Sequence, residues 1–178
     1  LGLVGDGIRT VFVSVNHLAE QIMDHLGDGS HLGCSITYLR EQVDKPLETA
    51  GSLTLLPEEI RTGPHPIIVM NGDLMVEFSA GRLIQQHRSA GARLTIGVRT
   101  YSHKVPFGVV DMDAERRVTG ISEKPDLKVD INTAVYCVDP AAIDLLPAGE
   151  PSTMPELVQS CLDRGDDVRT WRINSEWI

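Results

Sequence analysis

Two hydrophobic patterns alternate along the first hundred residues. Short runs of β-branched and apolar residues are typical of strands, and stretches in which apolar residues recur every three or four positions are typical of helices. The predicted strands are 10–15, 34–39, 66–70 and 94–99, and the predicted helices are 18–26, 51–60 and 79–90. Because the run 66–70 is apolar at every position, it has the composition of a central strand in a sheet covered on both faces. This order predicts an α/β fold with helices on both faces of the sheet and ligands at the carboxyl ends of its strands.

The rhythm changes after residue 100. Residues 107–111 and 117–121 predict a hairpin around a turn at 112–115. The remaining predicted elements are a strand at 132–138, helices at 140–146 and 154–164, and a last strand at 168–173. No repeat or linker interrupts the pattern, so we expect one domain over residues 1–178.

Composition narrows the classes of protein that remain. The 178 residues are 42% hydrophobic, which is enough for one sizeable core, and the formal charge of −9 argues against a nucleic-acid partner. Cys34, Cys137 and Cys161 are far apart and odd in number, which favours buried free thiols in a reducing cytoplasm over disulfides or a zinc site. No apolar run has the length of a membrane span, so no membrane partner is expected. The six histidines are isolated from one another and are expected at the surface or at helix caps.

Asp73 is the first candidate for chemistry. It follows the predicted strand 66–70, so its carboxylate is expected at the edge of the sheet, where it can hold a hard cation without being buried. Gly72 lets a phosphate or a sugar approach the backbone closely. The alternative is that Asn71, Gly72 and Asp73 form an ordinary turn.

Three further groups of residues have both a functional and a structural interpretation. Glu123 and Lys124 offer a hydroxyl acceptor beside a cation, although such surface charges are usually only solvated. Gly108 opens a strand, where it permits either close approach of a ligand or an edge bulge. Asn132 and Tyr136 can reach a sugar hydroxyl, although a strand tyrosine more often serves packing.

Several segments, taken in order, resemble the sugar-phosphate nucleotidyltransferases, also called NDP-sugar pyrophosphorylases. The resemblance covers nearly the whole chain and is closest to bacterial members that transfer guanylyl, thymidylyl or uridylyl groups. The matching segments are Val13-Ser14-Val15-Asn16, Tyr38-Leu39-Arg40-Glu41, residues 46–53, Ile68-Val69-Met70-Asn71-Gly72-Asp73, residues 106–110, Glu123-Lys124-Pro125 and residues 132–136.

The resemblance implies a Rossmann-like three-layer α/β/α fold with a mostly parallel mixed sheet, and it implies a reaction. A nucleoside triphosphate and a sugar 1-phosphate would give an NDP-sugar and pyrophosphate with Mg²⁺ as cofactor. Asp73 would be the catalytic metal ligand, and Lys124 would hold the sugar phosphate. The remaining implied contacts are Glu41, Thr49, Ala50 and Gly51 on the nucleobase side, Asn71 and Gly72 beside the substrate, and Gly108, Glu123, Asn132 and Tyr136 on the sugar.

The sequence departs from the family pattern in three places. A phosphate loop of the form G-x-G-T-R-L is not found, so we expect the first strand to be missing. Residues 175–178 resemble the stretch before the family's Asp-x-Gly, whose aspartate is the second metal ligand. Glu48 stands where the family commonly has glycine, and its carboxylate would either favour a guanine-type base or point to solvent.

These departures predict a domain that is truncated at both ends and inactive alone. Such a domain would expose apolar surface and would form a homo-oligomer.

Two rival interpretations remain open from the sequence. Asp111 and Asp113 have the DxD form with which glycosyltransferases of the related fold bind a metal, although a solvated hairpin turn explains them more simply. The second rival is a non-catalytic regulatory or subunit-contact domain of the same family.

Overall fold

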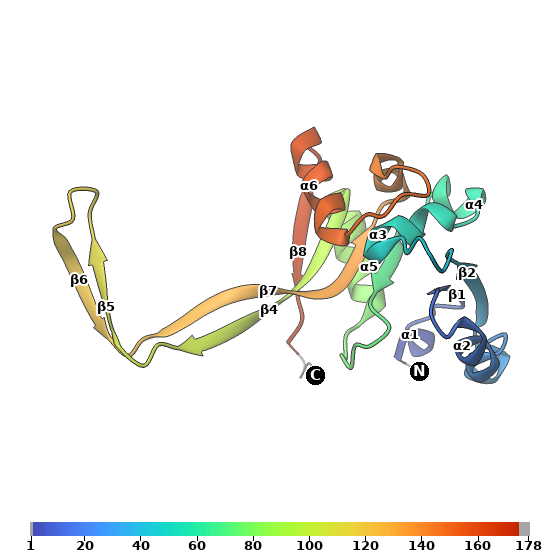
Figure 1. Cartoon of the computed structure of the whole chain (residues 1–178), viewed down its shortest axis with the longest axis horizontal. Coiled ribbons are helices and arrows are strands. Elements are labelled where there is room, and N and C mark those ends of the chain that lie inside the picture. Colours follow the sequence, from blue (N-terminus) through green and yellow to red (C-terminus); the bar gives the residue numbers. More distant parts are fainter. Residues whose placement is uncertain (1, 175–178) are drawn as a thin grey trace.

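The computed structural model describes residues 2–174, and its centre is built from strands (Figure 1). The strands are β1 (Thr10–Val15), β2 (Ser35–Arg40), β3 (Ile67–Met70), β4 (Leu94–Lys104), β5 (Gly108–Met112), β6 (Val118–Glu123), β7 (Asp126–Val138) and β8 (Val168–Arg172). The α-helices are α1 (Gly2–Gly5), α2 (Ala19–Leu26), α3 (Glu48–Gly51), α4 (Glu58–Arg61), α5 (Ala80–Ala90) and α6 (Met154–Arg164). The 3₁₀-helices are η1 (Ser30–Leu32), η2 (Ser52–Leu55) and η3 (Pro140–Leu145).

The main sheet has four strands in the order β3-β7-β4-β8. β7 is antiparallel to both of its neighbours and β8 is parallel to β4, so three of the four strands run in one direction. β1 and β2 form a separate parallel pair, and β5 and β6 form an antiparallel hairpin. The predicted α/β class with a mixed sheet is therefore confirmed.

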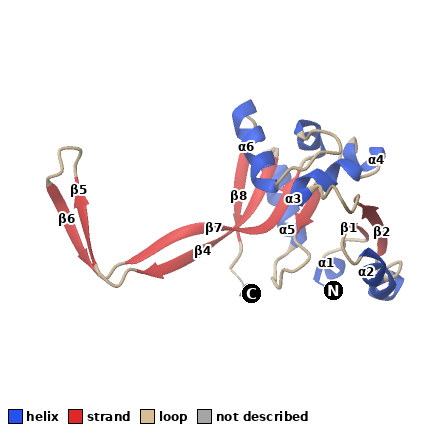
Figure 2. Cartoon of the chain, in the orientation of Figure 1, coloured by secondary structure: helices blue, strands red, loops and turns tan. Residues whose placement is uncertain are grey.

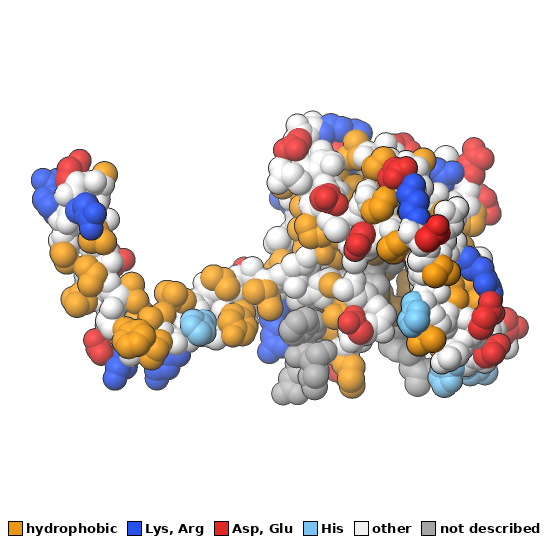
Figure 3. All heavy atoms as spheres, viewed as in Figure 1, with side chains coloured by type: hydrophobic (Ala, Val, Ile, Leu, Met, Phe, Trp, Pro, Cys, Tyr) orange, Lys and Arg blue, Asp and Glu red, His pale blue; other side chains and the backbone are white. Residues whose placement is uncertain are grey.

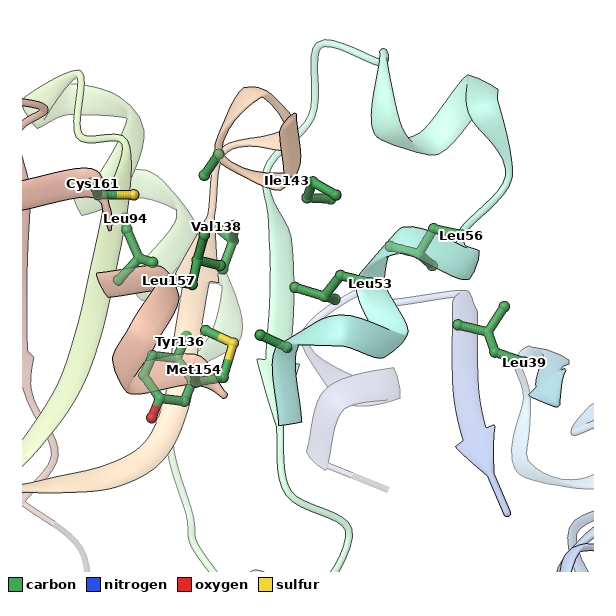
Figure 4. Packing of buried hydrophobic residues seen from close by; sticks show 12 residues of the cluster. Leu39, Leu53, Leu56, Leu94, Tyr136, Val138, Ile143, Met154, Leu157 and Cys161 are labelled. Carbon is green, nitrogen blue, oxygen red and sulfur yellow. The ribbon is translucent and has the colours of Figure 1, made fainter. Parts of the chain in front are cut away.

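Helical segments cover both faces of the main sheet, which gives three layers. Alternate residues of β7 point to opposite faces, as the pleat of a strand requires. Tyr136 and Val138 pack with η2, η3 and α6, whereas Val135 and Cys137 pack with α5. Figure 4 shows the first of these clusters. The helical layer on each side of the sheet therefore packs against apolar side chains from one face of β7.

An apolar slot separates the two sheets. β1 pairs with β2, and β3 pairs with β7. The side of β1 that faces away from β2 and the side of β3 that faces away from β7 line a cavity of about 390 Å³. Phe12, Leu53, Ile60 and Ile68 contribute to its walls.

This slot also corrects one prediction. The apolar run 66–70 predicts a central strand, but β3 lies at the edge of the four-stranded sheet. Its apolar composition arises because it contacts both the core and the slot.

A two-stranded arm extends from the body. β8 pairs with β4 only as far as Val98, whereas β4 and β7 remain paired out to Lys104 and Asp126. The β5–β6 hairpin continues the arm beyond that point (Figure 1). Of the described helices, none lies along the arm (Figure 2). The predicted hairpin is confirmed, with its turn at 113–117.

Two predicted helices differ from the observed elements. The stretch 51–60 is three short pieces, α3, η2 and α4, because Leu56 is extended and Pro57 follows it. Residues 140–145 form a 3₁₀-helix rather than an α-helix. The helix predicted at 154–164 is confirmed as α6, which begins with a capping box between Thr153 and Glu156.

One histidine is not at the surface. His87 is buried on α5, with Nδ1 at 2.9 Å from the Thr95 hydroxyl, and burial lowers its pKa. All three cysteines are free, and Cys137 and Cys161 are buried as predicted, whereas Cys34 is half-buried. Burial raises the pKa of the Cys137 thiol to about 12.

Candidate active site

The carboxyl end of β3 is anchored to an irregular part of β7. The backbone N–H of Asn71 donates to the carbonyl of Ala134 at 3.3 Å. Ala134 has a φ of 56°, in the left-handed region, and the β4–β7 register shifts beside it. The bulge therefore holds the turn that carries Asn71, Gly72 and Asp73 against β7.

Asn132 and Tyr136 meet across this bulge. The Asn132 Nδ2 donates to the Tyr136 hydroxyl at 2.5 Å, and its Oδ1 accepts the Ala134 N–H at 2.9 Å. The Tyr136 residue is only 3% exposed and lies beside Met154 (Figure 4). Thus Asn71, Asn132 and Tyr136, which the family resemblance assigns to substrate contact, converge on one part of the sheet.

Gly97 makes the bulge possible. The Thr133 hydroxyl donates to the Gly97 carbonyl at 2.8 Å. A Cβ at Gly97 would lie 2.7 Å from the Thr133 Oγ1 and 3.0 Å from the Val135 carbonyl oxygen. A side chain at this position would consequently push β7 away from β4.

The predicted nucleobase side is fixed to the N-terminus of α6. The N–H groups of Ala50 and Gly51 donate to the Ser152 carbonyl at 2.8 and 3.0 Å, and the Thr49 hydroxyl accepts the Met154 N–H at 2.8 Å. A Cβ at Gly51 would lie 2.6 Å from the Glu150 carbonyl oxygen. Since these polar groups are engaged within the protein, Ala50 and Gly51 contribute the shape of this wall.

Glu41 ties the end of β2 to the loop that follows it. One carboxylate oxygen accepts the Ser14 hydroxyl at 2.5 Å, and the other accepts the Leu47 N–H at 2.8 Å. The two contacts join β1, β2 and the loop before α3. Glu41 is therefore a positioning residue for the predicted nucleobase side.

The backbone conformation at Glu48 accounts for the glycine that the family commonly has at this position. Its φ is 62°, in the left-handed region where glycine is favoured, and the residue is exposed. The backbone at this position thus requires a conformation that glycine adopts without strain, whatever the side chain does.

Asp73 is exposed in the turn after β3. Among residues 2–174, no three His, Cys, Asp or Glu side chains are close enough together to hold a metal ion. One carboxylate at an open edge suits Mg²⁺, which is commonly bound by one or two carboxylates together with substrate phosphates and waters. The exposed carboxylate of Asp73 has the chemistry of such a ligand.

Gly108, Glu123 and Lys124 lie together elsewhere. Gly108 pairs with Glu123, whose carboxylate would be 3.1 Å from a Cβ at Gly108, and the Lys124 N–H donates to the Phe107 carbonyl. These residues are at the junction of the arm and the hairpin. Asp126 and Tyr136 are ten residues apart on one strand, so this junction is roughly 30 Å from Tyr136. The structure thus places the predicted residues in three groups, which are the end of β3 with β7, the Thr49–Gly51 wall with Glu41, and the arm junction.

The hairpin turn accounts for the DxD pattern. The Asp113 carboxylate accepts both the backbone N–H and the Nε–H of Arg117, at 2.9 and 2.8 Å, and these bonds hold its pKa below the usual range. Asp113 therefore closes the turn, which supports the simpler interpretation of this segment.

Comparison with known protein families identifies the family of this chain. The family model described as nucleotidyl transferase matches residues 2–177. The chain belongs to the nucleotidyl transferase family. The resemblance seen in the sequence motifs is confirmed.

Curated nucleotidyl transferases are identical to this chain at about a third of the aligned positions or fewer. A UTP–glucose-1-phosphate uridylyltransferase of Synechocystis is 28% identical over 97% of this chain and 48% of its own length. A probable mannose-1-phosphate guanylyltransferase of Oryza sativa is 34% identical over 78% of this chain and 39% of its own length. The chain therefore spans about half the length of these relatives, or less.

Solved nucleotidyl transferase structures have the same fold. The structure of HddC from Yersinia pseudotuberculosis has a TM-score of 0.69 at 21% identity and covers 99% of this chain and 75% of its own. A putative glucose-1-phosphate thymidylyltransferase from Bacillus anthracis has a TM-score of 0.70 at 20% identity, with 99% and 72% covered. The Rossmann-like fold of the nucleotidyl transferases is thus confirmed for this chain.

Three residues that shape the site have no signal in the sequence. Ser14 and Ser152 act through hydrogen bonds between segments far apart in the chain, and no local pattern predicts such partners. Ala134 adopts a positive φ that its residue type does not suggest.

Within residues 2–174, no helix combines the length and the apolar composition that a membrane span requires.

Proposed function

We propose that this chain carries substrate-binding elements of an enzyme that joins a nucleoside triphosphate to a sugar 1-phosphate, releasing pyrophosphate. The observation that carries the proposal is the convergence of Asn71, Asn132 and Tyr136 at the end of β3, beside the exposed Asp73 turn. Membership of the nucleotidyl transferase family supports it. The free, buried thiols are in keeping with a cytoplasmic location.

The proposed reaction needs alignment more than acid–base chemistry. An oxygen of the sugar phosphate attacks the α-phosphorus, a new P–O bond forms, and the bond from the α-phosphorus to the bridging oxygen breaks as pyrophosphate leaves. Because the attacking oxygen is already anionic, no proton has to be removed from it. The residues of the site would therefore act by holding two anions in line.

Each wall of the site has a proposed part in this alignment. The Thr49–Gly51 wall, held to α6 and braced by Glu41, would receive the nucleobase. Asn132 and Tyr136 form a linked amide and phenol pair that would contact sugar hydroxyls.

Asp73 would hold Mg²⁺ together with the substrate phosphates. The ion would neutralise the charge that develops on the phosphates during transfer. A Cβ added at Gly72 would meet no atom of the described residues within 4 Å, so a phosphate has open space beside this glycine.

The arm residues are proposed for the sugar side as well. Lys124 would hold the sugar phosphate, and Glu123 and Gly108 would contact the sugar. Lys124, Glu123 and Gly108 lie roughly 30 Å from Tyr136. Their proposed role therefore requires the arm to come close to a site of the kind that Asn132 and Tyr136 form. We therefore expect chain 1–178 to bind substrate without sustained turnover.

Magnesium-dependent nucleotide binding tests the proposal. Titration of GTP, UTP and dTTP by calorimetry, with MgCl₂ or with EDTA, should give Mg²⁺-dependent binding of at least one of them to chain 1–178. Asp73→Asn should remove the Mg²⁺ dependence, whereas Asp163→Asn, an exposed acid on α6, should keep it.

Turnover in the complete gene product gives the second readout. Pyrophosphate release from a nucleoside triphosphate and a sugar 1-phosphate should fall at least about a hundredfold in Asp73→Ala, as expected when charge stabilisation in a transition state is lost. Unchanged turnover and unchanged magnesium demand in this variant would remove the basis of the proposal.

A further inference from the structure

Glu48 directly precedes the Thr49–Gly51 wall in the chain, and its side chain is exposed. Within residues 2–174, no hydrogen bond or ion pair involves its carboxylate. The nearest lysine along the chain, Lys45, is paired with Glu150 at 2.9 Å instead. A charged group is thus free at the edge of the wall that is proposed to receive the nucleobase.

Exposure alone does not distinguish Glu48 from other acids. Figure 3 shows red acidic side chains spread over the body of the molecule, and charged side chains at a surface are usually only solvated. Among the described acidic residues, however, only Glu48 has a positive φ, and its value of 62° lies in the left-handed region that disfavours a Cβ. A side chain at a strained backbone position indicates a function of the side chain itself.

The other polar groups of this wall are engaged within the protein. The N–H groups of Ala50 and Gly51 and the hydroxyl of Thr49 bind the segment that begins α6. Glu41 uses both of its carboxylate oxygens as acceptors of hydrogen bonds from the protein. Glu48 is therefore the acid of this wall whose oxygens are available to a ligand.

An ionised carboxylate discriminates between nucleobases, because it accepts hydrogen bonds through two oxygens and donates none. Guanine presents two neighbouring donors, N1–H and the 2-amino group, which match the two oxygens. Uracil and thymine present one N–H between two carbonyl oxygens, so the second carboxylate oxygen would face a carbonyl oxygen and be repelled. Adenine and cytosine present one amino group beside a ring nitrogen that itself accepts. Of these bases, guanine alone offers a carboxylate two adjacent donors.

We propose that the Glu48 carboxylate accepts hydrogen bonds from N1–H and the 2-amino group of a guanine base, so that the nucleoside triphosphate of this chain is GTP. This inference rests on the proposed function, whose base it names. It also gives the strained backbone a role, since glycine would adopt the same conformation without strain but has no carboxylate.

Calorimetric titration of chain 1–178 with GTP, ITP, UTP and dTTP in MgCl₂ tests the proposal. GTP should bind at least about tenfold more tightly than UTP or dTTP, as expected from a bidentate contact with one base edge. ITP keeps N1–H and lacks the 2-amino group, so it should bind at least about fivefold more weakly than GTP.

Glu48→Gln changes only the group that meets the base. An amide has one acceptor and one donor, which suit the edge of uracil better than that of guanine, so the preference for GTP over UTP should fall at least about tenfold. Glu48→Gly should lose the preference as well, although it relieves the backbone strain, so a loss of folding would not explain the result. The control is Glu58→Gln, the same change at an exposed acid on α4, which should keep the preference within about twofold.

Failure of this inference and failure of the proposed function give different results. If UTP or dTTP binds in a Mg²⁺-dependent manner and GTP binds no more tightly, the role of Glu48 is overturned and the proposed function stands. A preference for GTP that survives in Glu48→Gln also overturns the role of Glu48. If none of the four nucleotides binds, both proposals fail.

Discussion

Glu41 accepts the backbone N–H of Leu47 at 2.8 Å and so closes the loop between β2 and α3. The second carboxylate oxygen accepts the Ser14 hydroxyl, so one side chain joins β1 to this loop. A residue that sequence motifs would assign to ligand contact is thus engaged first in holding the wall of the site.

Replacing Glu41 should consequently affect stability as well as binding. Glu41→Ala removes the acceptor of two hydrogen bonds, and bonds to a charged group contribute about 1.5–3 kcal/mol each. Because the bond to Ser14 is exposed and contributes little, urea denaturation should show a loss of about 1.5–3 kcal/mol, mainly from the bond to Leu47. Glu20→Ala, which breaks only the exposed pair with Arg40, should cost less than about 1 kcal/mol. Equal losses in the two variants would contradict the bracing role.

Glycine at position 48 should stabilise the chain. Glu48 has a φ of 62°, and relief of this left-handed strain is worth about 1 kcal/mol. Glu48→Gly should raise the thermal midpoint by about 2–4 °C in a protein of this size. Glu48→Ala keeps the strained Cβ and should give no such rise, so a comparable gain with alanine would exclude the backbone explanation.

Gly97→Ala should disturb the bulge that presents Asn132 and Tyr136. The added Cβ would lie within 3.0 Å of the Thr133 Oγ1 and of the Val135 carbonyl, and overpacking of this kind costs about 1–3 kcal/mol. Amide exchange at 132–136 should rise together with the loss of stability. Gly81→Ala is the control, because its nearest atom is 3.9 Å away. Unaltered exchange at 132–136 would show that β7 tolerates a side chain at 97.

Acid should destabilise the chain in part through His87. Burial lowers the pKa of this histidine in the folded protein, so below its ordinary value of 6.5 the unfolded chain binds the extra proton more readily. Stability is then lost as the pH falls below about 6.5 towards the folded pKa. His87→Gln should flatten this part of the curve of unfolding free energy against pH. A curve of the same slope in the variant would place the acid sensitivity elsewhere.

Sequence patterns predict the local elements of this fold well. The helix 154–164 and the hairpin at 107–121 are found where periodicity and turn residues place them. The edge position of β3 is not predictable in this way, because an apolar strand has the same composition whether a sheet or a slot lies beside it.

The candidate site shows the same limit. Asn71, Asn132 and Tyr136 converge because a bulge in β7 aligns them, and the positive φ of Ala134 has no sequence signal. The distance of Lys124 from this group follows from the length of β7, which runs six residues further towards the N-terminus than its apolar pattern indicates.

The slot between β1 and β3 has a consequence for the dimensions of the site. Glu41 is at the end of the β1–β2 pair, whereas Asn71, Asn132 and Tyr136 belong to the four-stranded sheet. No ladder of backbone hydrogen bonds among the described residues connects these two sheets across the slot. The spacing of β1 and β3 is therefore set by side-chain packing, so the distance between Glu41 and the proposed sugar contacts Asn132 and Tyr136 can adjust to the size of a ligand more readily than it could in a continuous sheet.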